Sequence, residues 1–324
     1  MRPPVAGKGG SLFRGTSIGT TWFWLGAFAL LPGLALLLVS VLDKGEIDFF
    51  IPVLTLRNYE ELLGPVFLTV LWDSVRLAAL STLVCLLLGY PFAYRVARAR
   101  PKWRPWLLLL VIIPFWTNSL IRTYALILII GAQGMVNKVL LGLGIIHEPL
   151  AMMYTDFAVF VGLTYTLLPF MVLPLYASIE KLDPTLGDAA KDLGAGSLRT
   201  FWHITLPLTL PGIVAGSMLV FLPSLGMFYV PEILGGAKNL LLGTFIKNQF
   251  LQANNWPLGA AASTVLTILL VLMAGLYRFV SLRVSGRERK GLLPGALGDP
   301  DVMNGKKRRA RDGETAGAKN AGGA

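Results

Sequence analysis

The stretch GDAAKDLGAGSLRTFWHITLP (residues 187–207) is the longest interruption of apolar sequence in the middle of the chain. Hydrophobic runs flank it on both sides, and each run approaches the ~20 residues that a helix needs to cross a bilayer core. Six such runs lie at about residues 21–42, 75–96, 106–130, 156–179, 210–230 and 260–282. They predict an all-α, polytopic membrane protein with six transmembrane helices, in which residues 187–207 form a loop.

The composition supports this fold class. Of the 324 residues, 54% are hydrophobic and 15% are charged, which gives more apolar surface than a soluble domain of this length could bury. The first run is long enough to span a membrane, so we interpret it as a retained anchor rather than a cleaved signal peptide. Pro114 and Pro169 predict kinks in the third and fourth spans. Cys85 is the only cysteine, which excludes an intrachain disulfide.

Lysine and arginine are distributed unequally between the two sides of the predicted membrane. With a cytoplasmic N-terminus, the inside segments hold basic clusters such as residues 95–104, whereas the outside segments keep only Lys44, Arg57, Arg76, Lys138, Lys238 and Lys247. Because cytoplasmic loops carry the excess of basic residues, both termini are expected in the cytoplasm. This distribution also accounts for the net charge of +11 without a nucleic-acid partner.

The chain then divides into three parts. Residues 1–20 form a cytoplasmic N-terminal segment, residues 21–285 a transmembrane domain with a cytoplasmic loop at about 180–209, and residues 286–324 a basic cytoplasmic tail. The tail is rich in Gly and Ala and lacks apolar periodicity, so we expect it to be disordered. Its charges either fix the topology or attract anionic membrane lipid.

The cytoplasmic loop carries the signals of two short helices. Asp183 followed by Pro184 is typical of a helix start, and Gly194 is suited to the left-handed turn that ends a helix. Ser197 can cap a second helix, and Pro207 and Pro211 are expected to break the chain before the fifth span. Between the first two signals, one apolar helix face is predicted from Leu186, Ala189, Ala190 and Leu193. Such a hairpin could be a packed loop or a segment that enters a groove on another protein.

The loop resembles the EAA loop of ABC-importer permeases. The matching positions are Asp188, Ala189, Ala190, Gly194, Ile204, Leu206 and Pro207, although the acidic residue of the family is commonly Glu, so Asp188 is shorter by one methylene group. The resemblance implies the six-helix fold of type I importer permeases (MetI-like). It also implies that the loop is a coupling helix seated on a dimer of ATP-binding subunits. The chain has no G-x-x-x-x-G-K-[ST] phosphate loop, so ATP and Mg are expected on that partner, with no cofactor or metal in this chain.

Two further stretches, IIPFWTNSLIRTYA (112–125) and LGGAKNLLLGTFIKNQFLQANNWPLGAA (234–261), resemble the permeases of spermidine/putrescine importers. The resemblance implies a second related permease subunit and a periplasmic solute-binding protein as partners. A polyamine path requires aromatic faces and few carboxylates. Candidates are Trp116, Tyr124, Tyr165, Phe228, Tyr229 and Glu232. Ordinary packing or interfacial anchoring is the alternative for each aromatic residue, and anchoring of the following loop is the alternative for Glu232.

Arg122 and the two histidines are interpreted as residues outside the substrate path and outside any metal site. Arg122 lies within a span, where a charge must face protein or water, and we expect it to pair with a backbone carbonyl or an acid. His147 and His203 are far apart in the predicted topology and make no metal site.

The resemblance therefore implies a bacterial inner-membrane permease subunit that moves polyamines into the cytoplasm and catalyses no covalent chemistry. Three alternatives remain at this point. The first is an ABC permease for another small solute such as iron, sulfate or molybdate. The second is a secondary carrier, which would often show ionisable groups at mid-span. The third is a membrane-embedded enzyme, which would need a cluster of His, Asp or Glu at one membrane face.

Overall fold

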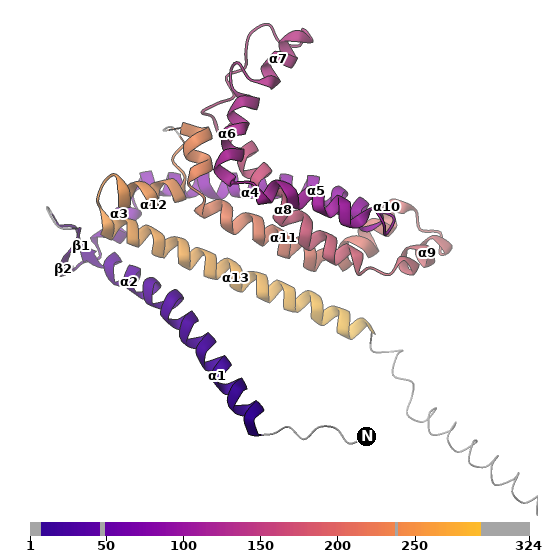
Figure 1. The fold of residues 1–324 in the computed structure, drawn as a ribbon, viewed down its shortest axis with the longest axis horizontal. Helices are drawn as coiled ribbons and strands as arrows, with labels where there is room; N and C mark the ends of the chain where they lie inside the picture. The colour runs from indigo at the N-terminus through magenta and orange to yellow at the C-terminus, as the bar shows by residue number, and fades with distance from the viewer. Residues whose placement is uncertain (1–7, 46–48, 237–238, 293–324) are drawn as a thin grey trace, which may run out of the picture. The chain divides into compact units, whose positions relative to one another are not determined.

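The computed structural model describes residues 8–45, 49–236 and 239–292, and it is mainly helical (Figure 1). Six helical segments within these residues are long and apolar enough to cross a membrane: Thr16–Ser40, Pro65–Ala97, Ser119–Gly142, Asp156–Glu180, Ser197–Gly226 and Trp256–Phe279. The first consists of the second half of α1 (Lys8–Leu25) and the whole of η1 (Gly26–Leu30) and α2 (Leu31–Ser40). The prediction of six spans is confirmed.

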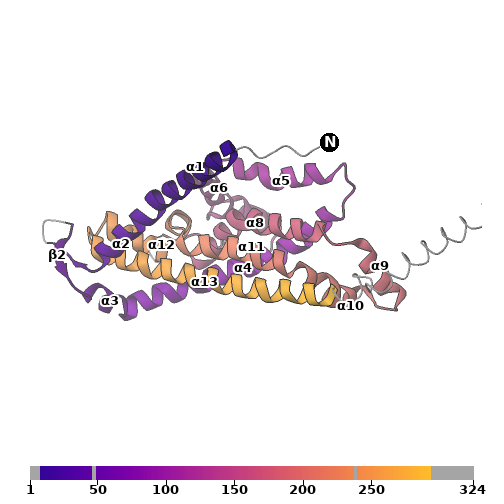
Figure 2. The same ribbon diagram turned by 90° about the horizontal axis from the view of Figure 1, so that it is seen from below.

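Three long helices form the packed centre of the chain. They are α4 (Pro65–Ala97), α8 (Asp156–Glu180) and α11 (Leu206–Gly226), which lie side by side (Figures 1 and 2). Their contact is made by buried residues such as Cys85, Met171 and Val220. The backbones approach closely at glycines: a Cβ on Gly212 would lie 2.4 Å from Cβ of Ser178. Small residues at such contacts are typical of helices that pack inside a membrane.

The third predicted span is not one kinked helix. α5 (Arg104–Trp116) ends two residues after Pro114, Thr117 is extended, and α6 (Ser119–Ile130) begins after Asn118. The Asn118 side chain accepts a hydrogen bond of 2.8 Å from the backbone N–H of Leu120. Asn118 therefore caps a second helix, and the chain breaks between α5 and α6 where a kink was expected.

Short elements occupy the segments between the spans. The strands β1 (Leu42–Asp43) and β2 (Ile51–Leu54) pair antiparallel, so the chain is not purely α-helical. Asn58 donates hydrogen bonds to the carbonyl oxygens of Ser40 (3.0 Å) and Leu42 (2.8 Å), which joins it to the end of α2 and to β1. Further short elements are α3 (Arg57–Leu62), η3 (Pro231–Gly235) and α12 (Leu242–Leu251), whereas α7 (Met135–Gly142) forms the end of the third candidate span.

The chain forms two compact units, residues 1–274 and 275–324. The last helix, α13 (Trp256–Leu292), ends within the second unit. The expected start of a disordered tail at residue 286 therefore falls within a helix. At the other end, α1 begins at Lys8, inside the predicted N-terminal segment. Residues 1–7 and 293–324, where the remainder of both predictions falls, lie outside the described residues.

Candidate functional site

The loop between α8 and α11 begins with the expected helix cap. The Asp183 carboxylate accepts a hydrogen bond of 2.9 Å from the backbone N–H of Thr185, at the start of α9 (Pro184–Asp192). This hydrogen bond holds the pKa of the Asp183 carboxyl below its ordinary value. The charged form of Asp183 therefore stabilises the first turn of α9.

Gly194 ends this helix in the predicted left-handed conformation, with a φ of +80°. The N–H of Ala195 donates to the carbonyl oxygen of Ala190 at 2.9 Å. The N–H of Gly194 donates to the carbonyl oxygen of Lys191 at 2.8 Å. These two bonds form a Schellman motif, which satisfies the last carbonyls of the helix. A Cβ on Gly194 would meet no atom within 4 Å, so the constraint on this position is the backbone conformation alone.

The second half of the loop differs from the prediction. α10 (Ser197–Thr200) is capped by Gly196 without a side-chain hydrogen bond, so Ser197 is the first helical residue and not the cap. The helix continues through a π-helical turn, η2 (Phe201–Thr205), into α11 without the expected break. Pro207 directly follows the π-helical turn, and Pro211 lies one turn further along the same helix, so both prolines are accommodated inside a continuous helix.

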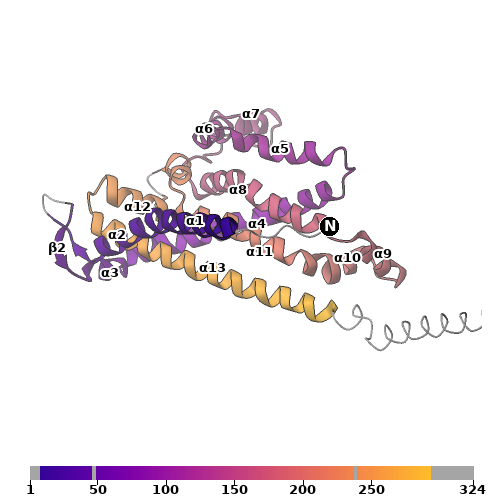
Figure 3. The same cartoon turned by 60° about the horizontal axis from the view of Figure 1, so that its bottom comes forward.

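The predicted apolar face of α9 forms one wall of an open groove. Leu186, Ala189, Ala190 and Leu193 line it together with Arg199, His203 and Ile204 from the second half of the loop, and its volume is about 560 Å³. Leu193 is 88% exposed. Leu206, also a predicted position, instead packs against the core of α4, α8 and α11. α9 and α10 lie at one end of the long helices (Figure 3), and the loop presents an exposed apolar surface there.

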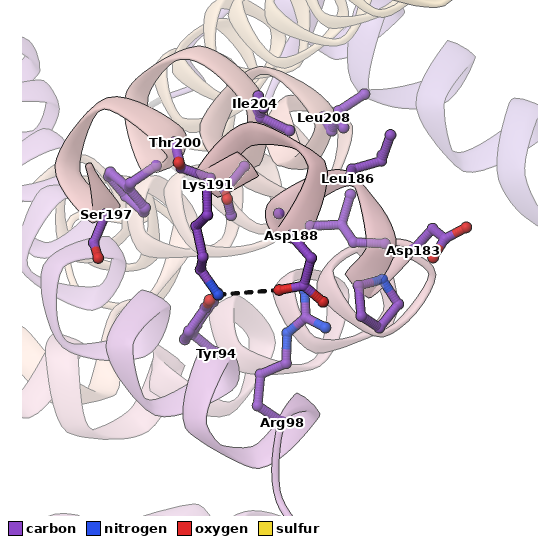
Figure 4. A pocket seen from close by; sticks show the side chains of 15 residues that line it. Tyr94, Arg98, Asp183, Leu186, Asp188, Lys191, Ser197, Thr200, Ile204 and Leu208 are labelled. Atoms are coloured by element: carbon purple, nitrogen blue, oxygen red, sulfur yellow. Dashed lines mark hydrogen bonds and ion pairs between the residues drawn. The ribbon is translucent and has the colours of Figure 1, made fainter. Parts of the chain in front are cut away.

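The acidic residue of the loop, Asp188, forms an ion pair with Lys191 at 3.0 Å, and both side chains are mostly exposed. They line a second pocket, which also receives Tyr94 and Arg98 from the end of α4 (Figure 4). The Arg98 guanidinium carbon lies 5.8 Å from the centroid of the Tyr94 ring. The sequence-based prediction missed these two residues; the signal that could have found them was the basic cluster at residues 95–104, on the same predicted side as the loop.

The aromatic candidates for a substrate path do not form one cluster. Phe228 and Tyr229 are in contact, with ring centroids 6.1 Å apart, and the Tyr229 hydroxyl accepts a hydrogen bond of 2.5 Å from Ser119 at the start of α6. Trp116, Tyr124 and Tyr165 are exposed on α5, α6 and α8. Among the described residues, no ring contact joins these three to Phe228 or Tyr229.

Glu232 in η3 forms an ion pair of 2.5 Å with Lys247 on α12, 15 residues further along the chain. The Lys247 side chain is only 16% exposed, whereas that of Glu232 is 44% exposed. The ion pair joins Glu232 to α12, which is compatible with the anchoring alternative, and part of the Glu232 carboxylate stays accessible.

Arg122 does not show the expected partner. Its side chain is buried on α6, with the guanidinium carbon 5.8 Å from the centroid of the Phe115 ring. Its Nε has no hydrogen-bond partner within the part of the chain that the structure describes. A cation–π contact thus takes the place of the predicted carbonyl or acid. Within the same part of the chain, no group of three His, Cys, Asp or Glu side chains is placed to hold a metal ion.

Residues 85–286, more than half of the chain, match the family described as binding-protein-dependent transport system inner membrane component. The chain belongs to this family. It is a multi-pass permease of the inner membrane in an ABC importer, and not an enzyme, because ATP hydrolysis resides on a separate subunit in such importers. The secondary-carrier and enzyme alternatives are therefore rejected.

Several relatives of this permease have assigned transport systems. The spermidine/putrescine transport system permease protein PotB of Escherichia coli K12 is 52% identical over 254 residues, covering 78% of this chain and 92% of the relative. The protein of the same name from Haemophilus influenzae is 46% identical over 265 residues, covering 82% and 93%. The molybdenum transport system permease protein ModB of Mycobacterium bovis is 31% identical over 255 residues, covering 79% and 90%.

A solved structure shares the fold of this permease. The crystal structure of a bacterial ABC transporter involved in the import of the acidic polysaccharide alginate aligns with a TM-score of 0.66 at 17% identity, covering 84% of this chain and 96% of that one. This agreement confirms the predicted importer-permease fold.

Proposed function

We propose that this permease carries polyamines such as spermidine and putrescine across the inner membrane into the cytoplasm. The observation that carries the proposal is the identity of 46–52% to spermidine/putrescine permeases over about four fifths of the chain. The stretches at residues 112–125 and 234–261, which carried the resemblance to these importers, contribute Ser119 to the Tyr229 hydrogen bond and Lys247 to the Glu232 ion pair.

In this proposal the loop at residues 180–209 is the coupling helix. The apolar groove lined by Ala189, Ala190 and Leu193 supports it, because exposed apolar surface held by a rigid cap and a Schellman motif is suited to docking on another subunit. The partner is a dimer of ATP-binding subunits that binds ATP and Mg. Closure of this dimer moves α9 as a rigid body, and the uninterrupted helix from α10 into α11 transmits the displacement to the fifth span.

The proposed topology places both termini and the coupling loop in the cytoplasm. It is supported by the basic residues of the predicted inside segments. A second related permease and a periplasmic solute-binding protein complete the importer. In the substrate path, aromatic side chains contact the passing cation transiently: Trp116, Tyr124, Tyr165, Phe228 and Tyr229. Glu232 attracts the cation at the outer end of the fifth span.

A different solute is the second candidate, since a permease of a molybdenum transport system is 31% identical. A molybdate path would carry an anion. The higher identity of 46–52% to spermidine/putrescine permeases favours the polyamine proposal.

The test is accumulation of labelled putrescine and spermidine by cells that lack other polyamine importers and express this permease with its companion subunits. We expect saturable uptake, and we expect Glu232→Gln to reduce uptake more than it reduces the amount of assembled complex. Glu148→Gln, which changes another exposed carboxylate on the predicted outer side, is the matched control and should leave uptake unchanged. Uptake of molybdate or sulfate without polyamine uptake would contradict the proposal.

A further inference from the structure

The helix α5 has no fully buried residue, although it belongs to an apolar run of the length of a span. Figures 2 and 3 show it at the edge of the packed centre of α4, α8 and α11. Val111 packs against that centre, and the ring of Phe115 meets the ring of Phe170 on α8 with centroids 5.1 Å apart. Because none of its side chains is buried, α5 is held less firmly than the central helices and is able to move as one piece.

The first residue of α5 is joined to the base of the coupling loop. Nη1 of Arg104 lies 3.5 Å from Oε1 of Glu180, the last residue of α8. Nε of Arg104 also donates to the carbonyl oxygen of Ala99 at 2.9 Å, so the guanidinium is oriented from a second side. Glu180 precedes by three residues Asp183, which caps α9. A displacement of the loop therefore reaches the start of α5.

The other end of α5 is joined to the end of the fifth span. Ser119, the first residue of α6, donates a hydrogen bond of 2.5 Å to the hydroxyl of Tyr229, which lies just beyond the end of α11. The Arg122 guanidinium stands over the Phe115 ring, so a contact bridges the break between α5 and α6. Movement of α5 therefore reaches Tyr229 through Ser119.

We propose that α5 is a second transmission element beside α11, with Arg104 and Ser119 as the positioning residues at its two ends. The inference rests on the proposed coupling role of the loop and adds a route to it. Since α5 has 13 residues and is about 20 Å long, it connects two contacts that are too far apart to interact directly. Closure of the ATPase dimer shifts Glu180, α5 follows as one piece, and Ser119 reorients the ring of Tyr229.

The experiment uses the complete importer in proteoliposomes and measures how much labelled putrescine is imported for each ATP hydrolysed. Glu180→Gln removes the charge at one end of the route, and Ser119→Ala removes the hydrogen-bond donor at the other. Each change should lower this ratio by about fivefold, an ordinary size for coupling between two sites. The KM for uptake should stay unchanged, because neither change removes an aromatic candidate of the substrate path. Ser217→Ala on α11, which removes a hydroxyl without a hydrogen bond to another described element, is the control.

The double variant separates transmission from a structural role. If α5 transmits the displacement, releasing both ends should cost no more than releasing one, because a helix detached at one end transmits nothing. Two independent defects at this separation multiply instead, to about 25-fold, and that result would overturn the proposal. Unchanged ratios in both single variants would overturn it as well. If Glu180→Gln does not assemble, Arg104→Gln breaks the same ion pair and takes its place.

A second readout keeps this proposal apart from the polyamine function. Stimulation of ATP hydrolysis by the binding protein, used as purified from cells, does not depend on which solute is carried. The same non-additive loss of stimulation in a complex that imports no putrescine would reject the polyamine function and retain the role of α5. Normal putrescine import with unchanged stimulation in all variants would retain the function and reject the role of α5.

Discussion

Gly194 shows how a single residue sets the geometry of the coupling loop. Its φ of +80° is strained for any residue with a Cβ, and a β-branched side chain tolerates it least. We predict that Gly194→Val destabilises the turn by ~1 kcal/mol or more. The complex should insert and assemble, but transport and ligand-stimulated ATP hydrolysis should be lost.

The same position offers an internal control, because Asn adopts the left-handed conformation more readily than other residues. Gly194→Asn should therefore retain most of the transport activity in the same uptake and ATPase assays. Since an added Cβ meets no atom within 4 Å, a steric clash inside this chain does not explain a defect. Normal coupling in Gly194→Val would remove the turn from the mechanism.

At the scale of one helix, α9 depends on the charged form of Asp183. The pKa of this carboxyl is lowered in the folded state, so its contribution is complete above the ordinary value of 3.8 and is lost as the pH falls through the lowered pKa. We predict that hydrogen exchange of the α9 amides, corrected for the intrinsic rate, is the same at pH 6 and pH 8. Asp183→Ala should accelerate it at both values, and Asp183→Asn should do so less. Unaltered protection in Asp183→Ala would contradict this role.

The contact between α8 and α11 depends on close approach. A side chain on Gly212 would meet Ser178 Cβ at 2.4 Å and the carbonyl oxygen of Pro174 at 2.9 Å, whereas one on Gly226 of the same helix would meet nothing within 4 Å. Overpacking at such a contact costs ~1–3 kcal/mol. Gly212→Leu should therefore lower the temperature at which the purified complex aggregates, and Gly226→Leu should not. Equal stability of the two variants would show that the helices are not held this closely.

The elements that could be predicted from the sequence are those with strong local signals. Long apolar runs gave the six spans, and Asp183 and Gly194 marked both ends of α9, because cap and turn chemistry is local. The break at Asn118 was missed because the apolar run continues through it and hides a cap of only one residue. Pro211 was overestimated as a helix breaker, since packing inside a bundle tolerates a missing N–H that an isolated helix does not.

The polar contacts between elements could not be predicted from the sequence. Glu232 and Lys247 are separated by 15 residues, and the pocket beside Asp188 receives Arg98 from a helix some 90 residues earlier. Neither pairing has a periodicity that would reveal it. The candidate residues at the ends of spans could therefore be named from the sequence, but not their partners, which depend on how the helices pack.

For the whole molecule, the topology is open to a direct test. We predict that a cysteine replacing Lys102, in a background where Cys85 is changed to Ser, reacts with a membrane-impermeant maleimide only after the inner membrane is permeabilised. A cysteine replacing Lys44, an exposed residue in a predicted outside segment, should react in intact cells. Reaction at position 102 from the periplasmic side would overturn the orientation.

The most direct test of the whole account is accumulation of labelled spermidine in proteoliposomes that contain this permease, its companion permease and the ATPase subunits. The binding protein is added outside, and ATP and Mg are enclosed. We predict that spermidine accumulates above its external concentration, and only when hydrolysable ATP is enclosed. Saturable accumulation of molybdate or sulfate by the same complex with its own binding protein, without spermidine transport, would contradict the account.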